Sequence, residues 1–144
     1  MVAKILFHYA DAQLPVNHKR KIQSFIAEIF KKEKVALLRL DYIFCSDGYL
    51  LNINRNFLNH DFYTDIITFD LSVAKTGITG EVYISVERVK ENAGLFNFQF
   101  EDEALRVIFH GALHLCGYKD KKKEDIALMR KKEETYMRFF KKYK

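Results

Sequence analysis

The chain has 144 residues, 49% of them hydrophobic and only one of them proline, a composition that excludes a disordered or low-complexity protein. Two cysteines without paired spacing exclude a disulfide framework, and no run approaches the ~18 apolar residues of a membrane-spanning helix. The net charge is +5, and its excess lies at the end, because residues 119–144 carry 11 Lys and Arg against 5 Asp and Glu, whereas residues 1–118 carry 13 against 14. We therefore expect one domain over residues 1–144, in the cytoplasm and with no membrane partner.

The first half of the chain alternates predicted strands and helices. Residues 3–9 are predicted to form a short strand, and residues 15–17 lead into a helix whose apolar side chains recur at the i, i+3, i+4 spacing. Residues 38–45 alternate in polarity as a strand does, and Ser46–Gly48 ends that strand. Residues 49–57 are predicted to form a second, shorter helix. The apolar stripe of the first helix belongs to the core and consists of Ile22, Phe25, Ile26, Ile29 and Phe30.

The second half begins with two strands and ends with helices. Residues 64–71 are rich in β-branched side chains, and residues 80–85 follow after a connection that contains glycine, so we predict an antiparallel pair. Helices are predicted at about residues 86–96 and 101–116, and from about residue 123 to the end. Strands that come early and helices that come late predict an α+β fold, with a mixed sheet of about four strands and helices packed on it.

Two histidines four residues apart carry the strongest functional signal. His110 and His114 lie in an otherwise apolar run of the predicted helix 101–116. Four residues make slightly more than one helical turn, so both imidazoles project from one face and can bind one metal ion. Gly117 then offers a place for the helix to stop. The alternative is that the two histidines recur at this spacing by chance, and the metal site is the interpretation that we prefer.

A catalytic zinc ion usually has three protein ligands and one open position. Asp120 is our candidate for the third ligand, because it follows the glycine turn and offers a hard, anionic oxygen. Glu124 and Asp125 are weaker candidates, since the next helix has begun to carry them away. Cys116 points to the opposite side of the helix from the histidines and is interpreted as a small core residue.

The residue after the first histidine separates this helix from that of the zinc proteases. Those enzymes have a glutamate there as general base, whereas this chain has Gly111, which argues against peptide hydrolysis. The metal would then have to lower the pKa of its bound water toward ~7, and a phosphodiester substrate suits that arrangement if a cation lies nearby. The basic C-terminal segment is compatible with nucleic acid, and on charge alone equally with a solvated helix face.

Four segments in series, residues 51–55, 64–69, 80–85 and 110–120, carry motifs that together resemble those of the YbeY family of metal-dependent, single-strand endoribonucleases. His110–Asp120 is similar to the family signature H-G-x-L-H-L-x-G-x-D-H. Residues 64–69 and 80–85 are similar to its P-T-D-V-L-S-F and G-D-I-x-I-S strands, and residues 51–55 to its element that starts with L-N and ends with R. The resemblance covers about residues 48–120 in the right order, which makes it far more specific than any one segment.

The chain departs from the family pattern around the proposed ligands and in both strands. Asp120 stands where the family has its final histidine ligand, and Lys119 replaces the aspartate before it. Tyr63 replaces the proline of the first strand, and Glu81 replaces the aspartate of the second. The ligand set would be two imidazoles and one carboxylate, which fits one catalytic Zn²⁺ per chain and leaves iron, nickel or manganese open.

The resemblance implies a hydrolase that cleaves single-stranded RNA in the 3′-end maturation of 16S rRNA and in ribosome quality control, with small-subunit ribosomal proteins as further partners. His110, His114 and Asp120 would hold the ion, metal-bound water would attack the phosphodiester, and Arg55 would contact the phosphate. From the sequence alone, Arg55 is more typical of a surface residue in an ion pair.

Two other functions stay open at this point. One is a non-catalytic ribosome assembly factor with a structural metal, whose basic tail docks on rRNA or on a ribosomal protein, and a closed shell of four protein ligands would favour it. The other is a metal-dependent hydrolase of another substrate, because metal sites of this type serve many chemistries. Activity on phosphate-free substrates would favour that alternative.

Overall fold

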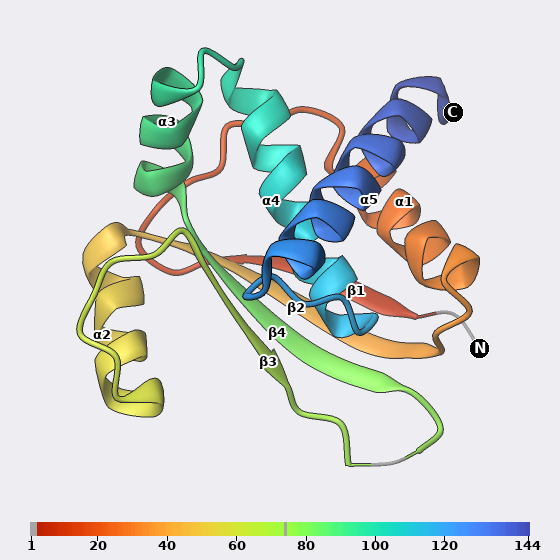
Figure 1. Ribbon diagram of the computed structural model, residues 1–144, viewed down its shortest axis with the longest axis horizontal. Coiled ribbons are helices and arrows are strands. Elements are labelled where there is room, and N and C mark those ends of the chain that lie inside the picture. Colours follow the sequence, from red (N-terminus) through yellow and green to blue (C-terminus); the bar gives the residue numbers. More distant parts are fainter. Residues whose placement is uncertain (1–2, 74) are drawn as a thin grey trace.

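A four-stranded sheet with helices on both faces forms the frame of the molecule (Figure 1). The computed structural model describes residues 3–73 and 75–144. The strands are β1 (Lys4–Tyr9), β2 (Leu37–Cys45), β3 (Ile66–Asp70) and β4 (Ile78–Ser85). Their order in the sheet is β1-β2-β4-β3; β2 is parallel to both of its neighbours, and β3 is antiparallel to β4. The expected α+β fold with a mixed sheet of four strands is confirmed, including the antiparallel pair.

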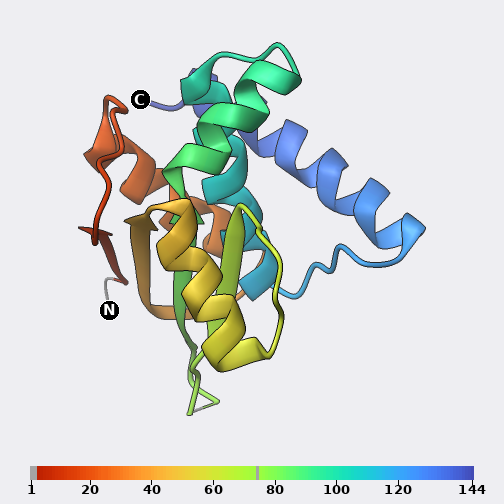
Figure 2. The same ribbon diagram turned by 90° about the vertical axis from the view of Figure 1, so that its left-hand side faces the viewer.

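The described part of the chain contains five helices, which are distributed over the two faces of the sheet. They are α1 (Lys19–Lys32), α2 (Asp47–Leu58), α3 (Val86–Leu95), α4 (Phe100–Leu115) and α5 (Lys123–Lys142). Parallel strands need a long crossover, and α1 supplies it between β1 and β2. In Figure 1, α1, α4 and α5 lie on one side of the sheet and α2 on the other, and Figure 2 shows α2 in front of the sheet. None of these helices has the length and apolar character needed to cross a membrane.

Alternating side chains along β2 separate two apolar clusters. Leu40, Tyr42 and Phe44 belong to a large buried cluster that they share with residues of α1, α4 and α5. Cys45, on the other face, belongs to a small cluster with Leu50 of α2 and residues of β3 and β4. The sheet is therefore thickly covered on the α4 side and only partly covered on the α2 side, so α4 is the more firmly held of the two helices.

α4 packs unusually close to the sheet. A Cβ atom at Gly111 would lie 2.8 Å from a methyl carbon of Val82 in β4 and 3.2 Å from one of Ile66 in β3, so a larger residue would push the helix away. The hydroxyl of Tyr42 also donates a hydrogen bond to the carbonyl of Ile108 at 2.7 Å, which joins β2 to the same turn of the helix. This contact accounts for glycine where zinc proteases have glutamate, and it brings both histidines of α4 beside the edge strand β3.

Two predicted boundaries were wrong for local reasons. The helix predicted at residues 49–57 starts earlier, at Asp47, because the hydroxyl of Ser46 caps it by accepting a hydrogen bond from the backbone of Tyr49 at 3.1 Å. The strand predicted from residue 64 starts later, at the first residue of β3. Thr64 donates a side-chain hydrogen bond to the carbonyl of Ile66 at 3.3 Å, ahead of the paired residues of β3.

Candidate metal centre

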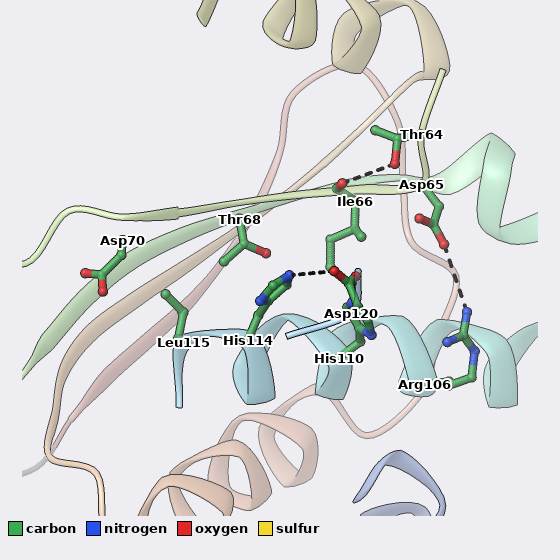
Figure 3. Close-up of a pocket in the computed structure, with 10 residues that line it drawn as sticks. All are labelled: Thr64, Asp65, Ile66, Thr68, Asp70, Arg106, His110, His114, Leu115 and Asp120. Carbon is green, nitrogen blue, oxygen red and sulfur yellow. Dashed lines mark hydrogen bonds and ion pairs between the residues drawn. The ribbon is translucent and has the colours of Figure 1, made fainter. Parts of the chain in front are cut away.

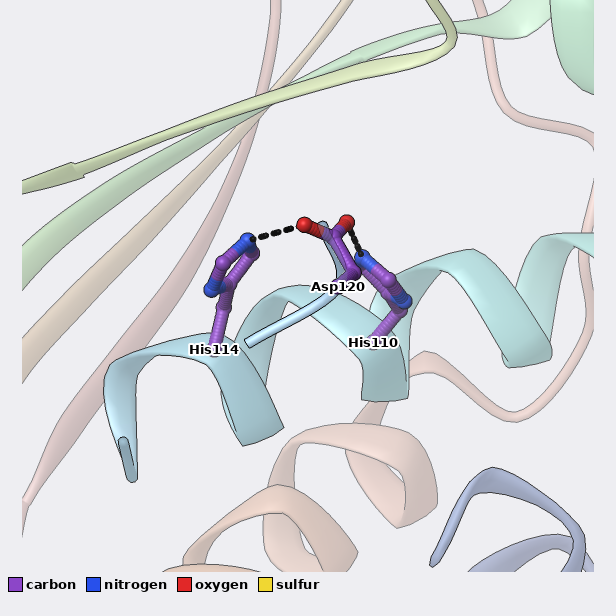
Figure 4. Close-up of side chains that lie close together, drawn as sticks. All are labelled: His110, His114 and Asp120. Carbon is purple, nitrogen blue, oxygen red and sulfur yellow. Dashed lines mark hydrogen bonds and ion pairs between the residues drawn. The ribbon is translucent and has the colours of Figure 1, made fainter. Parts of the chain in front are cut away.

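Three side chains converge where α4 ends. His110 and His114 come from α4 and Asp120 from the connection to α5, and one potential ligand atom from each lies within 4.8 Å of the others. The Nε2 atom of His110 is 3.1 Å from one oxygen of Asp120, and the Nε2 atom of His114 is 3.5 Å from the other oxygen (Figure 4). The structure thus brings together the three residues that the sequence predicted as metal ligands.

The end of α4 explains how the chain delivers Asp120. Gly117 adopts φ +110°, and its N–H donates to the carbonyl of His114 at 3.0 Å, while the N–H of Tyr118 donates to that of Leu113 at 3.1 Å. This pair of bonds is the Schellman arrangement, which stops a helix and reverses the chain. The hydroxyl of Tyr118 then donates to Glu33, the C-cap residue of α1, at 2.6 Å and fixes the start of the connection. The loop is therefore directed back over the histidine face of α4.

A buried carboxylate lies behind His110. The Nδ1 atom of His110 donates to Glu133 of α5 at 2.6 Å, on the side of the ring opposite Asp120. The other oxygen of Glu133 accepts from Arg106 at 3.1 Å, and the same guanidinium makes two bonds, of 2.7 and 2.8 Å, to the buried Glu103. An unbroken chain of charged hydrogen bonds therefore runs from the interior to the ring of His110.

The three candidate ligands open onto a cavity of about 370 Å³ between α4 and β3. Figure 3 shows the side chains of the strand facing those of the helix across this space. The lining residues are Thr64, Asp65, Ile66, Thr68, Asp70, Arg106, His110, His114, Leu115 and Asp120. The Oγ1 atom of Thr68 is buried and has no hydrogen-bond partner among the described residues. The cavity has room for a polar ligand next to the converging nitrogen and oxygen atoms.

Electrostatics around the cavity are dominated by burial and by neighbouring charges. Burial by itself lowers the pKa of His110, but the hydrogen bond and charge of Glu133, with the charge of Asp120, outweigh burial and raise it above its ordinary value. Burial by itself raises the pKa of Glu133, and its contacts with His110 and Arg106 bring that pKa below the usual range. Burial raises the pKa of Asp65, although the charge of Arg106, 4.0 Å away, opposes the shift. In the metal-free protein the contact between the two residues therefore favours the charged forms of both Glu133 and His110.

Two residues discussed from the sequence lie apart from the ligands. Arg55 is in the last turn of α2 and pairs with the exposed Asp61; of the described residues, ten line the cavity, and Arg55 is not one of them. Cys116 packs against the large apolar cluster, and burial raises the pKa of its thiol to about 12, which disfavours the thiolate that binds metal. Its interpretation as a core residue agrees with this position. The role of Arg55 stays a prediction.

Sequence reasoning missed Glu133, although a signal was present. Met129 and Tyr136 are buried, and Glu133 stands between them at helical spacing, on the face of α5 that turns to the core. An acidic residue on an apolar stripe needs a partner inside the protein. A search for polar residues within the apolar stripe of α5 would have identified this carboxylate. It would not have identified His110 as the partner of Glu133.

Comparisons with known proteins agree with this arrangement. The family model described as Endoribonuclease YbeY matches residues 5–141. Endoribonuclease YbeY of Cytophaga hutchinsonii is 50% identical over 131 residues, which cover 91% of this chain and 92% of that protein. Endoribonuclease YbeY of Porphyromonas gingivalis is 46% identical over 133 residues, or 92% of this chain and 87% of that protein. A Thermotoga maritima protein of known solution structure is 28% identical, with a TM-score of 0.65 that covers 98% of this chain and 93% of that one.

Proposed function

We propose, since this chain belongs to the YbeY family of endoribonucleases, that it cleaves single-stranded RNA at the cavity between α4 and β3. The family match makes the chain an RNA-hydrolysing enzyme. We further propose that its substrate is the 3′ end of the 16S rRNA precursor, that it acts in ribosome quality control in the cytoplasm, and that small-subunit ribosomal proteins are partners. The basic segment 119–144 supports a polyanionic substrate.

The metal dependence rests on one observation, the convergence of His110, His114 and Asp120 beside an open cavity. Two imidazole nitrogens and a carboxylate oxygen form a donor set that suits a divalent transition metal. The hydrogen bond to Glu133 keeps a proton on Nδ1 of His110, so Nε2 is the atom that gives up its proton and offers its lone pair when a metal ion binds. We propose Zn²⁺ as the ion, one per chain, and the same donors are also compatible with iron, nickel or manganese.

The residues around the cavity have different roles in the proposed hydrolysis. His110, His114 and Asp120 would hold a divalent cation, which would supply Lewis acidity and make water more acidic at this end of the cavity. His110 and His114 contribute neutral donors, and Asp120 contributes the charge that offsets part of the cation's charge. The wall formed by β3 confines the phosphodiester against the helix and limits the water that reaches it.

Arg55 is our proposed phosphate contact. Its side chain is half exposed, and its contact with the exposed Asp61 is an ion pair of the kind that contributes little stability. A guanidinium in such a pair can exchange its carboxylate for a phosphate at small cost, and its planar fork matches the geometry of phosphate oxygens. Arg106 lines the cavity itself, but three bonds to Glu103 and Glu133 already hold it. The exposed arginine is therefore the better candidate for a moving contact.

Cleavage of a labelled single-stranded RNA tests the proposal. Wild-type protein, His114→Ala and Arg55→Ala are purified identically and tested with Zn²⁺, with a chelator, and on the same sequence as a duplex. We expect cleavage of the single strand by wild type, loss of that activity in His114→Ala and in the chelator, and a reduced rate for Arg55→Ala. Equal cleavage by wild type and both variants would show that the activity comes from a contaminant and would contradict the proposal.

The non-catalytic alternative has less support from the geometry. A structural metal is usually enclosed by four protein ligands, whereas the cluster found in the described residues has three and faces a cavity. The alternative of a different hydrolase is distinguished by substrate: activity on phosphate-free esters or peptides, with none on RNA, would favour it.

A further inference from the structure

Glu133 occupies a place where an acidic side chain is costly. It is 3% exposed, and its neighbours on the inner face of α5, Met129 and Tyr136, are 2% and 3% exposed. A buried carboxylate loses its hydration and is tolerated only where hydrogen bonds and opposite charge replace the lost water. Its presence in an apolar stripe therefore calls for a specific partner.

Each oxygen of Glu133 has one partner, and the two partners have different roles. Oε2 accepts from Nδ1 of His110 at 2.6 Å, and Oε1 accepts from Nη1 of Arg106 at 3.1 Å. A carboxylate that accepts from Nδ1 fixes a proton there, so that in the neutral ring, the form that binds a metal, the lone pair is on Nε2. Nε2 is the atom that faces Asp120, 3.1 Å away. The hydrogen bond therefore turns the ring so that its donor atom points at the cation site.

The opposite end of the chain of bonds is fixed as well. Arg106 is held to Glu103, which is 0% exposed, through two nearly parallel bonds of 2.7 and 2.8 Å. A bidentate pair of this kind restricts both the position and the plane of the guanidinium. Arg106 can therefore hold Glu133 at one place, and Glu133 can hold His110.

We propose that Glu133 is a positioning residue of the metal centre, which sets the ring orientation of His110 before the ion arrives and the tautomer in which the ring binds it. The inference rests on the proposed metal-dependent function. A carboxylate behind a metal-binding histidine typically raises metal affinity by 10–100-fold, because the ring needs no reordering and its donor atom becomes more basic. α5 would then contribute to the centre without touching the ion.

The competing explanation for the buried Glu133 is that it only joins α5 to α4. Under it, Glu133 would serve only to attach α5 through Arg106, and the contact with His110 would have no consequence for metal binding. The two explanations differ in one measurable quantity, the affinity of the folded protein for Zn²⁺.

The test uses Glu133→Gln, which keeps the shape of the side chain, with Glu134→Gln as control. Glu134 is the next residue of α5 and is exposed. The affinity for Zn²⁺ alone is measured by competition with a chromophoric chelator, and thermal unfolding of the metal-free proteins is followed in parallel. We expect Zn²⁺ binding by Glu133→Gln to weaken by roughly 10–100-fold, and binding by Glu134→Gln to match wild type.

Each outcome decides between the explanations. A lower unfolding temperature for Glu133→Gln with wild-type Zn²⁺ affinity would overturn the inference and leave the proposed function intact. Failure of wild-type protein to bind Zn²⁺ would overturn both. A double-mutant cycle distinguishes the two explanations further. Glu133→Gln should weaken Zn²⁺ binding further when it is combined with His114→Ala. It should have no such effect when it is combined with His110→Ala, because the ring that Glu133 orients is then missing.

Wild-type protein offers a test that does not depend on the folding of any variant. Nitrogen NMR of the Zn²⁺-loaded protein distinguishes a protonated from a metal-bound ring nitrogen. We expect Nδ1 of His110 to carry the proton and Nε2 to bind the ion. Binding through Nδ1 would exclude a bond to Glu133 and would overturn the inference.

Discussion

Two sets of charged groups, one on each side of the sheet, are arranged in opposite ways. On the α4 side, one chain of hydrogen bonds joins Glu103, Arg106, Glu133 and His110, and its two carboxylates are buried. On the α2 side, Arg55 forms an exposed ion pair whose two side chains are 50% and 76% accessible. Water competes with every bond of an exposed pair, whereas burial makes an unpaired group costly and so fixes its orientation. The molecule thus combines candidate metal ligands that are held rigidly with an arginine side chain, Arg55, that is held only weakly.

Arg106→Ala should cause the largest loss of stability, because it acts on the buried carboxylates of the α4 side. It removes the positive charge between Glu103 and Glu133, so that the buried Glu103 loses its ion-pair partner and the buried Glu133 keeps only His110. Losing one member of a buried ion pair costs about 3–5 kcal/mol of unfolding free energy, and urea denaturation measures it. A cost below about 1 kcal/mol, the range of exposed pairs, would show that burial does not distinguish the two sides.

Gly111→Ala tests the close approach of α4 to the sheet. The added methyl group would meet Val82 at 2.8 Å, and we expect a loss of about 1–3 kcal/mol together with weaker Zn²⁺ binding, because the histidine turn must move. Gly48→Ala is the matched control on the α2 side, since a Cβ atom there has no neighbour within 4 Å. We expect it to be neutral or slightly stabilising. Equal effects of the two changes would contradict the packing described for α4.

The ion pair of His110 and Glu133 predicts a pH dependence of the metal-free protein. The pKa of His110 is raised in the folded state, so its contribution to stability is complete below the unfolded-state pKa and disappears as the pH rises through the folded-state pKa. In EDTA, the free energy of unfolding should therefore fall as the pH rises above ~6.5, and this part of the decline should be missing in His110→Gln. Identical pH profiles for the two proteins would contradict the ion pair.

Arg55→Ala should have the smallest effect on stability. An exposed pair with Asp61 contributes about 0–1 kcal/mol, and Zn²⁺ affinity should stay at the wild-type value because the side chain is remote from the ligands. RNA cleavage should nevertheless slow, with the loss in the rate and not in metal content. Wild-type cleavage by Arg55→Ala would remove this residue from the proposed mechanism.

The sequence predicted what local patterns encode. The four-residue spacing of His110 and His114, with the glycine turn before Asp120, depends on neighbours along one helix and its end, and the structure brings those three residues together. The partners of His110 beyond its own segment were not predictable in the same way. Glu133 reaches it only because α5 packs across α4, a tertiary contact that periodicity does not specify. The position of Arg55 relative to the cavity likewise depends on which face of the sheet α2 covers.

The metal content of protein purified without an affinity tag tests the central claim most directly. Elemental analysis of wild type and of Asp120→Ala, after equal dialysis, measures the ion and the unusual carboxylate ligand together. Three converging ligands predict about one divalent transition metal ion, Zn²⁺ in our proposal, per wild-type chain and a large loss in Asp120→Ala. A wild-type protein that binds no such ion, or an Asp120→Ala variant that retains it fully, would contradict the account.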